Sequence, residues 1–206
     1  MSEVNQPVPI ELPLHYWRDR GTREGASSKD LVVREAPLRG HLILRGNSEE
    51  QNFREAVETV VGLALPLAPC TTTENGDAGI YWLGPTEWLV IVAQDTKRGV
   101  EARLRHALQG RGVLVDVSGG QTLLNVSGSG VETLLMKSSG YDFQSGRFGT
   151  GRCVQTTFAK ATALVSKRGD GSVDVIVRRS FADYIARWIL DAGAEYDCAW
   201  QMIEPS

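Results

Sequence analysis

HLILRGNSEEQNFREAV, residues 41–57, is the stretch that decides the fold, because a strand-like run leads directly into an amphipathic helix. TLLNVSGSGVETLLMKS, residues 122–138, has the same layout of apolar strand, small polar residues and one-sided helix. A second pair, residues 86–104 and 172–189, also passes from an apolar strand into a helix. The chain therefore predicts one α/β unit that occurs twice in tandem.

Four helices are expected, each between a polar residue that can begin a helix and a glycine that can end it. In the first, third and fourth, an amide or acid three residues after the serine completes a capping box. The four pairs of boundary residues are Ser48 and Gly62, Asp95 and Gly110, Ser129 and Gly140, and Ser180 and Gly193.

Eight short runs rich in β-branched and aromatic residues are expected to be strands. They are residues 38–46, 79–84, 87–93, 112–118, 121–128, 153–160, 161–167 and 173–179. This order predicts an α+β fold made of a tandem pair of split βαβ (ferredoxin-like) halves, with helices packed on mainly antiparallel sheets. Residues 37–118 are expected to form the first half and residues 119–206 the second, within one integrated domain.

Residues 1–36 differ from the rest, being rich in proline and charge and poor in periodicity. Such a segment buries little apolar area by itself. We expect an extended N-terminal arm that is ordered only by a partner, with the aromatic side chains of Tyr16 and Trp17 as its anchors.

Composition excludes several classes of partner. The chain has 206 residues and a net charge of −3, which argues against nucleic acid and against an anionic membrane surface. The N-terminus lacks the basic start and apolar core of a signal peptide. We therefore expect a cytoplasmic protein whose three cysteines are reduced thiols.

Motifs for catalysis or cofactor binding are not found. Gly128-Ser129-Gly130 follows a strand and opens a helix, but the third glycine of a dinucleotide-binding motif is missing. The three histidines are far apart, and no two His or Cys residues have metal-ligand spacing. We expect no catalytic, cofactor-binding or metal-binding residue in this chain.

YWLGPTEWLVI, residues 81–91, places aromatic side chains next to Glu87. Such a cluster could hold a flat or cationic ligand, or it could be a hairpin whose large side chains fill a core. The Gly-Pro-Thr-Glu turn and the apolar faces favour the hairpin, with Trp88 in the core and Glu87 solvated. Trp82, together with Tyr184 and Trp188 on the last helix, is a further structural or interface candidate.

Two segments carry a family resemblance. WLGPTEWLVI (82–91) and RRSFADYIARWILDAG (178–193) resemble the gamma subunit of heterotetrameric sarcosine oxidase. Residues 115–143 are similar to that subunit and, more loosely, to the folate-binding aminomethyltransferases of glycine cleavage. The resemblance implies a fold like that of the folate-binding domain of these transferases.

The resemblance also implies a function. The family's four-chain enzyme oxidises sarcosine to glycine, produces hydrogen peroxide and passes a one-carbon unit to tetrahydrofolate. The alpha, beta and delta chains are then expected to carry FAD, FMN, NAD, tetrahydrofolate and zinc. The gamma chain is expected to be a structural subunit that contacts mainly the large alpha chain and is inactive alone.

The sequence departs from the catalytic relatives at two places. Their strand after a glycine turn begins with two adjacent aspartates, whereas here Val173 stands where the first would align, before Asp174. Residues 151–154 (GRCV) lack the lysine and the aromatic ring of another folate-binding relative's motif. A stand-alone folate-binding or aminomethyltransferase-like enzyme is the alternative, and a small-molecule sensor domain is a third possibility.

Overall fold

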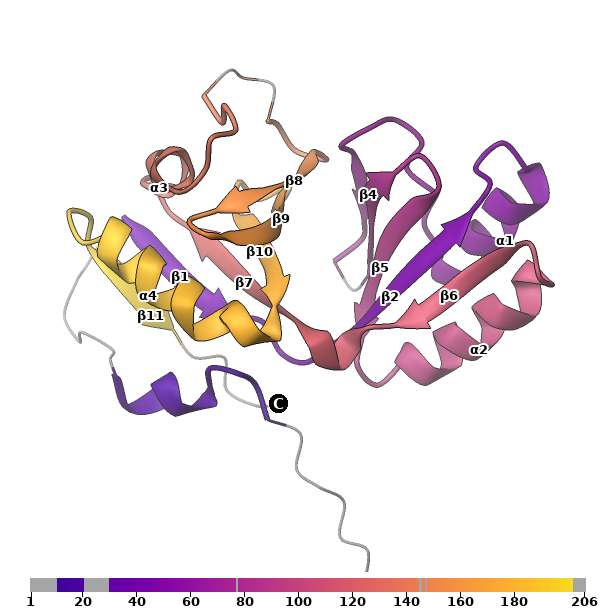
Figure 1. Ribbon diagram of the computed structural model, residues 1–206, viewed down its shortest axis with the longest axis horizontal. Coiled ribbons are helices and arrows are strands. Elements are labelled where there is room, and N and C mark those ends of the chain that lie inside the picture. The colour runs from indigo at the N-terminus through magenta and orange to yellow at the C-terminus, as the bar shows by residue number, and fades with distance from the viewer. Residues whose placement is uncertain (1–10, 21–29, 77, 145, 147, 202–206) are drawn as a thin grey trace, which may run out of the picture.

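A computed structural model describes residues 11–20, 30–76, 78–144, 146 and 148–201. Two sheets lie side by side at the centre, and helices cover their outer faces (Figure 1). In spatial order, the six-stranded sheet holds β11 (Cys198–Gln201), β1 (Leu31–Glu35), β7 (Gln121–Ser127), β10 (Val173–Arg178), β9 (Ala161–Lys167) and β8 (Cys153–Phe158). The five-stranded sheet holds β3 (Thr72–Glu74), β4 (Gly79–Gly84), β5 (Glu87–Ala93), β2 (Arg39–Gly46) and β6 (Gly112–Asp116).

The helices divide between the two sheets. Helices α1 (Gln51–Val61) and α2 (Lys97–Leu108) cover the five-stranded sheet, and α3 (Val131–Ser138) and α4 (Ala182–Ala192) cover the six-stranded sheet. Short 3₁₀ turns form η1 (His15–Arg20), η2 (Ser118–Gly120) and η3 (Arg179–Phe181). None of the helices in the described ranges is long and apolar enough to span a membrane.

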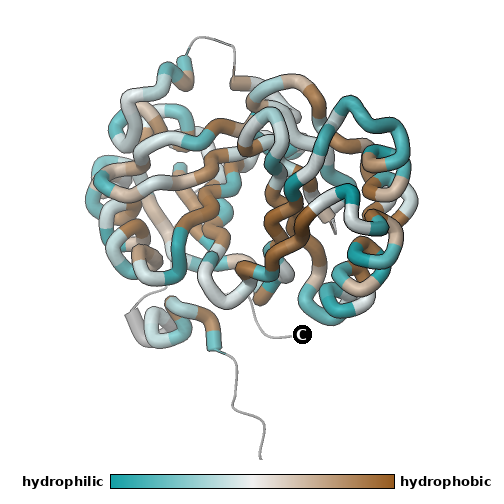
Figure 2. Tube along the Cα trace, turned by 45° about the vertical axis from the view of Figure 1, so that its right-hand side comes forward, coloured by the Kyte–Doolittle hydropathy of each residue, from teal (hydrophilic) through white to brown (hydrophobic). Residues whose placement is uncertain are grey.

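Side-chain alternation along the strands creates three apolar layers. On β2, Leu42 and Leu44 face α1 and α2, whereas Ile43 faces the other sheet. On β10, Val175 packs under α3 and α4, whereas Ile176 lies between the sheets. Figure 2 shows hydrophobic residues concentrated along these central strands. Because both faces of the central strands are covered, those strands read as nearly continuous apolar runs, whereas Val113 and Val115 on the edge strand β6 are exposed.

The predicted α+β class is confirmed, and both sheets repeat one βαββαβ pattern. In the five-stranded sheet the order is β4-β5-β2-β6, with β3 added at the edge. In the other sheet the matching order is β9-β10-β7-β11, except that β1 lies between β7 and β11 and β8 is added at the edge. All strand pairs are antiparallel except β1 with β11.

The expectation of an arm that is ordered only by a partner is wrong for the described part of residues 1–36. Strand β1 pairs with β7 and β11, which places Leu31 and Val33 fully inside the core. Leu14 and Trp17 join the same cluster. These four apolar residues are thus placed against strands that are distant in the sequence. Residues 1–10 and 21–29 of the predicted arm lie outside the described residues.

The predicted capping boxes are also wrong. Helices α1, α3 and α4 begin at Gln51, Val131 and Ala182, and their N-cap residues make no side-chain cap hydrogen bond. In α4 the acid of the expected box, Asp183, instead accepts hydrogen bonds from Tyr16 and Trp17. Tertiary partners have therefore replaced the local cap. Strands β1, β3 and β11 were not predicted, because each is short and its sequence does not alternate between apolar and polar residues.

Candidate functional site: a charged pocket between the sheets

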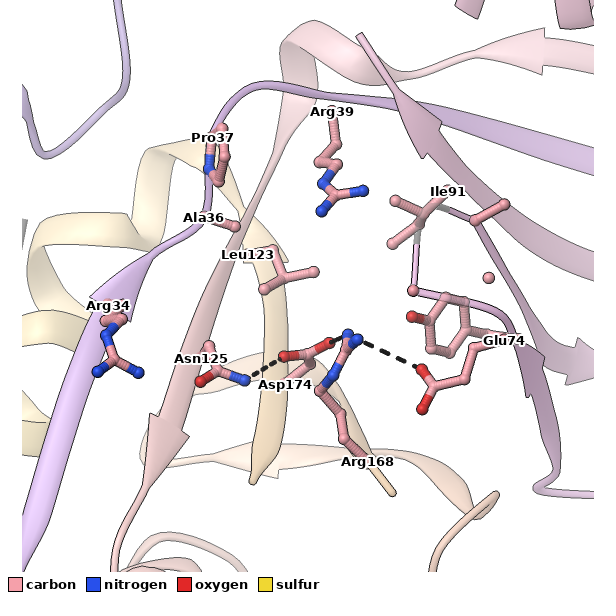
Figure 3. A pocket seen from close by; sticks show the side chains of 14 residues that line it. Arg34, Ala36, Pro37, Arg39, Glu74, Ile91, Leu123, Asn125, Arg168 and Asp174 are labelled. Atoms are coloured by element: carbon pink, nitrogen blue, oxygen red, sulfur yellow. Dashed lines mark hydrogen bonds and ion pairs between the residues drawn. The ribbon is translucent and has the colours of Figure 1, made fainter. Parts of the chain in front are cut away.

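A cavity of about 200 Å³ lies between the two sheets. Its walls come from β1, β2, β3, β4, β5, β7 and β10 and from the segments that follow β1, β3 and β9 (Figure 3). The charged or amide side chains that line it are Arg34, Arg39, Glu74, Asn125, Arg168 and Asp174, and the apolar part includes Ala78, Tyr81, Ile91 and Leu123. Charged groups are therefore concentrated where the two halves of the molecule meet.

Strand alternation places Asp174 in this pocket. Its neighbours Val173 and Val175 point into the core under the helices, so Asp174 points to the opposite face, toward the other sheet. Only 1% of Asp174 is exposed. Asn125 lies directly opposite Asp174 in the antiparallel register with β7. The acid that faces the pocket is thus Asp174, and Val173 occupies a position that could not reach a ligand there.

Both carboxylate oxygens of Asp174 are engaged. Arg168 Nη1 donates to Oδ2 at 2.8 Å, and Asn125 Nδ2 donates to Oδ1 at 2.7 Å. Arg168 directly follows β9 and begins a tight turn, in which Gly171 has φ 86° and Asp170 accepts hydrogen bonds from Ser172. Burial opposes the charge on Arg168, but the hydrogen bond to Asp174 and the negative charges of Asp174 and Glu74 together outweigh it and raise the pKa of Arg168.

Glu74 on β3 is less completely paired. Its Oε2 lies 3.8 Å from Arg168 Nη1, which is too long for a hydrogen bond, and this buried oxygen accepts none from the described residues. Burial raises the pKa of Glu74, and the charge of Arg168 opposes the rise. Burial likewise raises the pKa of Tyr81, so its hydroxyl stays protonated at neutral pH.

On the opposite side of the pocket, Arg34 donates from Nε and Nη2 to Oε1 of Gln201, at 2.9 and 2.6 Å. Arg39 lies across from Arg34 (Figure 3). The partner of Arg34 is thus a neutral amide and not a carboxylate. The arrangement is suited to binding by charge. A general base must be free to accept a proton, and Asp174 is not.

A larger hollow of about 670 Å³ lies beside this pocket, also between the sheets. Lys97 and Asp116 form an ion pair of 2.6 Å at its edge. Burial would raise the pKa of Asp116, but hydrogen bonds from Lys97 and Ser118 prevail and lower it to about 2. Glu87 also lines this hollow and pairs with the exposed Arg45 at 3.2 Å. Its surroundings are those of a partly solvated surface acid.

The aromatic residues singled out in the sequence are spread over the molecule. Trp88 is fully buried and donates from Nε1 to the Pro66 carbonyl at 2.9 Å. Trp82 is its ladder partner on β4 and is half-buried. Neither residue lines the charged pocket.

At the other end of the molecule, Tyr16 and Trp17 donate to Oδ1 of Asp183 at 2.7 and 3.0 Å. Trp188 donates to Ser138 Oγ at 3.0 Å, and Tyr184 packs partly buried against the same core. Tyr16 is 42% exposed. Their roles at an interface stay predictions.

Sequence reasoning missed the pocket residues. The one local signal is Asp174 itself, because a single acid inside the apolar run VDVIV needs a partner once the strand is buried. Among the described residues no three His, Cys, Asp or Glu side chains are grouped as a metal site would require. Burial raises the pKa of the Cys153 thiol to about 12, so it is not an activated nucleophile.

Comparison with known proteins places these features in a family. The model of the sarcosine oxidase gamma subunit family matches residues 45–195. Gamma subunits of sarcosine oxidase from Arthrobacter sp. and from Corynebacterium sp. strain U-96 are 28% and 29% identical over 177 and 178 residues. These alignments cover 84% and 85% of this chain and 85% of each relative.

Solved structures agree on the fold. A chain of heterotetrameric sarcosine oxidase from Corynebacterium sp. U-96, in complex with pyrrole 2-carboxylate, matches with TM-score 0.82 and 24% identity over 92% of this chain and 97% of that chain. Glycine cleavage system aminomethyltransferase T from Bartonella henselae matches with TM-score 0.62 and 10% identity over 84% of this chain and 48% of that chain. The resemblance of residues 82–91 and 178–193 is thereby confirmed: the chain belongs to the sarcosine oxidase gamma subunit family.

Proposed function

We propose that this chain is the gamma subunit of a heterotetrameric sarcosine oxidase and that it contributes structure rather than catalytic residues. The observation that carries the proposal is the similarity to gamma subunits along most of both chains. The complex would oxidise sarcosine to glycine, produce hydrogen peroxide and pass the one-carbon unit to tetrahydrofolate.

The partners in this proposal are the alpha, beta and delta subunits, with the large alpha chain as the main contact. FAD, FMN, NAD, tetrahydrofolate and zinc are assigned to those partners. A cytoplasmic location fits the three cysteines, Cys70, Cys153 and Cys198, which are all free thiols.

The geometry of Asp174 supports a non-catalytic role. A catalytic carboxylate must reach the substrate and exchange a proton or stabilise a developing charge. Here Arg168 and Asn125 hold both oxygens, and the residue is 1% exposed. The negative charge of Asp174 is thus used inside the protein to neutralise Arg168.

The test is reconstitution of the complex from separately produced subunits. We expect the isolated chain to be colourless and to produce no peroxide from sarcosine, and the assembled complex to turn over. Within the assembled complex, Glu87→Gln and Asp174→Asn should leave kcat nearly unchanged. A loss of kcat of two orders of magnitude or more in either variant, with the complex intact by size-exclusion chromatography, would show that the chain supplies a catalytic group.

A second candidate is a stand-alone folate-binding protein, which the aminomethyltransferase fold favours. The charged pocket of about 200 Å³ is smaller than the roughly 300–1,000 Å³ usual for small-molecule ligands, and in the hollow of about 670 Å³ beside it the carboxylate of Asp116 is already held by Lys97 and Ser118. We therefore expect no micromolar binding when tetrahydrofolate is titrated into the isolated chain. Micromolar binding would favour this second candidate over a structural subunit.

A further inference from the structure

We propose that this chain docks an acidic, extended segment of a partner subunit in a basic groove beside the hollow between the sheets. That the occupant is another subunit rests on the proposed function, whereas the docking face is assigned by the groove itself. The basic groove has a volume of about 580 Å³ and is lined by Pro13, His15, Gly119, Gly120, Arg178, Arg179 and Ser180. These residues come from η1 and the segment before it, from η2, and from the end of β10 with η3.

The lining of the basic groove is positive, and none of the described residues in it is acidic. Arg178 is exposed, and its side chain makes no hydrogen bond or ion pair with the residues that the structure describes. Arg179 donates from Nη2 to the carbonyl oxygen of Glu11 at 2.8 Å, which is a neutral partner. In a chain whose net charge is −3, the groove is thus a local excess of positive charge, and an acidic segment is complementary to it.

Two acids interact with lining residues but do not cancel this charge. Glu35 feels the charges of Arg179 and His15, but it is only 2% exposed and both of its oxygens accept hydrogen bonds inside the protein. Glu11 pairs through Oε2 with His15 Nε2 at 3.3 Å. Arg178 is therefore available to an external carboxylate, and such charge-assisted hydrogen bonds are about twice as strong as neutral ones.

The shape of the groove favours a length of chain over a small anion. The basic groove continues into the hollow of about 670 Å³ between the sheets, because Gly119, Gly120 and Arg178 line both. In that hollow Gln121 Oε1 is buried and accepts no hydrogen bond from the described residues. A fully ionised anion has no donor for this oxygen, whereas each residue of a peptide other than proline has a backbone N–H. A segment with its acidic residues in the basic groove could continue into the hollow and satisfy Gln121.

Exposed aromatic side chains accompany the basic groove. Tyr16 and Phe181 directly follow the lining residues His15 and Ser180 in the chain, and they are 42% and 40% exposed. Aromatic residues and arginine are enriched at interfaces between proteins, whereas acidic residues are depleted there. An acid-free groove with two arginines and two neighbouring exposed aromatic residues is therefore suited to another protein chain.

The experiment measures binding of the full chain to the assembled alpha, beta and delta subunits by analytical ultracentrifugation at low and high ionic strength. We expect the dissociation constant to rise with salt, because exposed charges are screened. Arg178→Glu should raise the dissociation constant by about tenfold or more at low ionic strength. Arg103→Glu is the matched control and should leave it unchanged, because Arg103 is likewise exposed but lies on α2 and lines neither hollow.

A steric variant tests the groove without a change of charge. A Cβ added at Gly119 would meet no atom within 4 Å, so Gly119→Tyr should fold normally while its ring obstructs the groove. Gly99→Tyr on α2 is the matched control, because a Cβ added there also meets no atom within 4 Å. We expect Gly119→Tyr to weaken binding by about tenfold or more and Gly99→Tyr to leave it unchanged. Circular dichroism checks that each variant is folded.

The outcomes separate the docking face from the proposed function. Unchanged affinity in a folded Arg178→Glu or Gly119→Tyr protein would overturn the docking face and leave the proposed function intact. If the unmodified chain did not bind the other subunits, both proposals would fail. Saturable binding of inorganic phosphate to the isolated chain, or a dimer of that chain, would assign the groove to a small anion or to a second copy if Arg178→Glu abolished it. Either result would also overturn the proposal.

Discussion

Replacement of Trp88 by alanine tests whether the hairpin of residues 81–91 is a structural element. Trp88 is fully buried, its ring centroid lies 5.9 Å from that of Phe53, and its Nε1 donates to the Pro66 carbonyl at 2.9 Å. Truncation of a buried tryptophan to alanine costs about 3–5 kcal/mol through lost burial and the cavity left behind. Loss of the donor to Pro66 adds about 1 kcal/mol or more. A loss of this size is a large fraction of the stability of an ordinary domain.

The assay is urea unfolding followed by far-UV circular dichroism, because the chain has five tryptophans and their fluorescence would change with the substitution itself. Trp88→Phe is the graded control, since it keeps most of the packing and loses the hydrogen bond, for an expected cost of about 1–2 kcal/mol. Glu87→Gln is the matched control on the same strand, and its exposed pair with Arg45 should contribute less than about 1 kcal/mol. If Trp88→Ala destabilised the protein by less than about 1 kcal/mol, the structural reading would be refuted.

Three further predictions concern buried or paired charges. Arg168→Gln leaves Asp174 buried without a counter-charge and should lower the free energy of unfolding in urea by about 3–5 kcal/mol. The double variant Arg168→Met, Asp174→Leu should restore most of this loss, because it removes both charges. A loss below about 1 kcal/mol in Arg168→Gln would contradict the prediction. Burial lowers the pKa of His41 from 6.5 to about 4, so the unfolded state binds the proton first. Stability should therefore be complete above pH 6.5 and fall by about 3 kcal/mol as the pH drops toward 4, a loss that is absent in His41→Leu. The hydrogen bond from Arg187, assisted by Tyr16 and Trp17 and opposed by burial, lowers the pKa of Asp183 to about 2. The stability that the ionised Asp183 side chain contributes should be present above pH 3.8 and vanish as the pH falls through 2. The difference in unfolding free energy between the unmodified protein and Asp183→Asn should therefore close over that range. A difference that does not change with pH would argue against the charge of Asp183 as its source.

Local pattern accounts for the elements that were predicted correctly. Residues 87–93 and 161–167 were placed as strands at the bounds that the structure has, because a Gly-Pro-Thr turn precedes the first apolar run and a Gly-Asp-Gly turn follows the second. The helix faces were also predictable. Phe53 and Val57 recur at helical spacing, and both are buried under the five-stranded sheet. Each of these signals lies within a dozen residues of chain.

Elements that depend on distant partners were not predictable in the same way. Strand β1 has five residues and owes its place to β7 and β11, which are far along the chain. The capping box expected at α4 does not form, and its acid, Asp183, is bound instead by Tyr16 and Trp17, which lie 167 and 166 residues away. Neither short strands nor long-range caps leave a periodic signal.

The amino-acid sequence by itself determined the α+β class, the duplicated pattern and the family, since periodicity and local turn chemistry are properties of neighbouring residues. Only the tertiary structure decided that Arg34, Glu74, Arg168 and Asp174 line one cavity. These residues come from four separate segments, and each alone reads as an ordinary charged side chain. The energy of a charge depends on burial and on the distance to its partner, and both are set only when the two sheets meet.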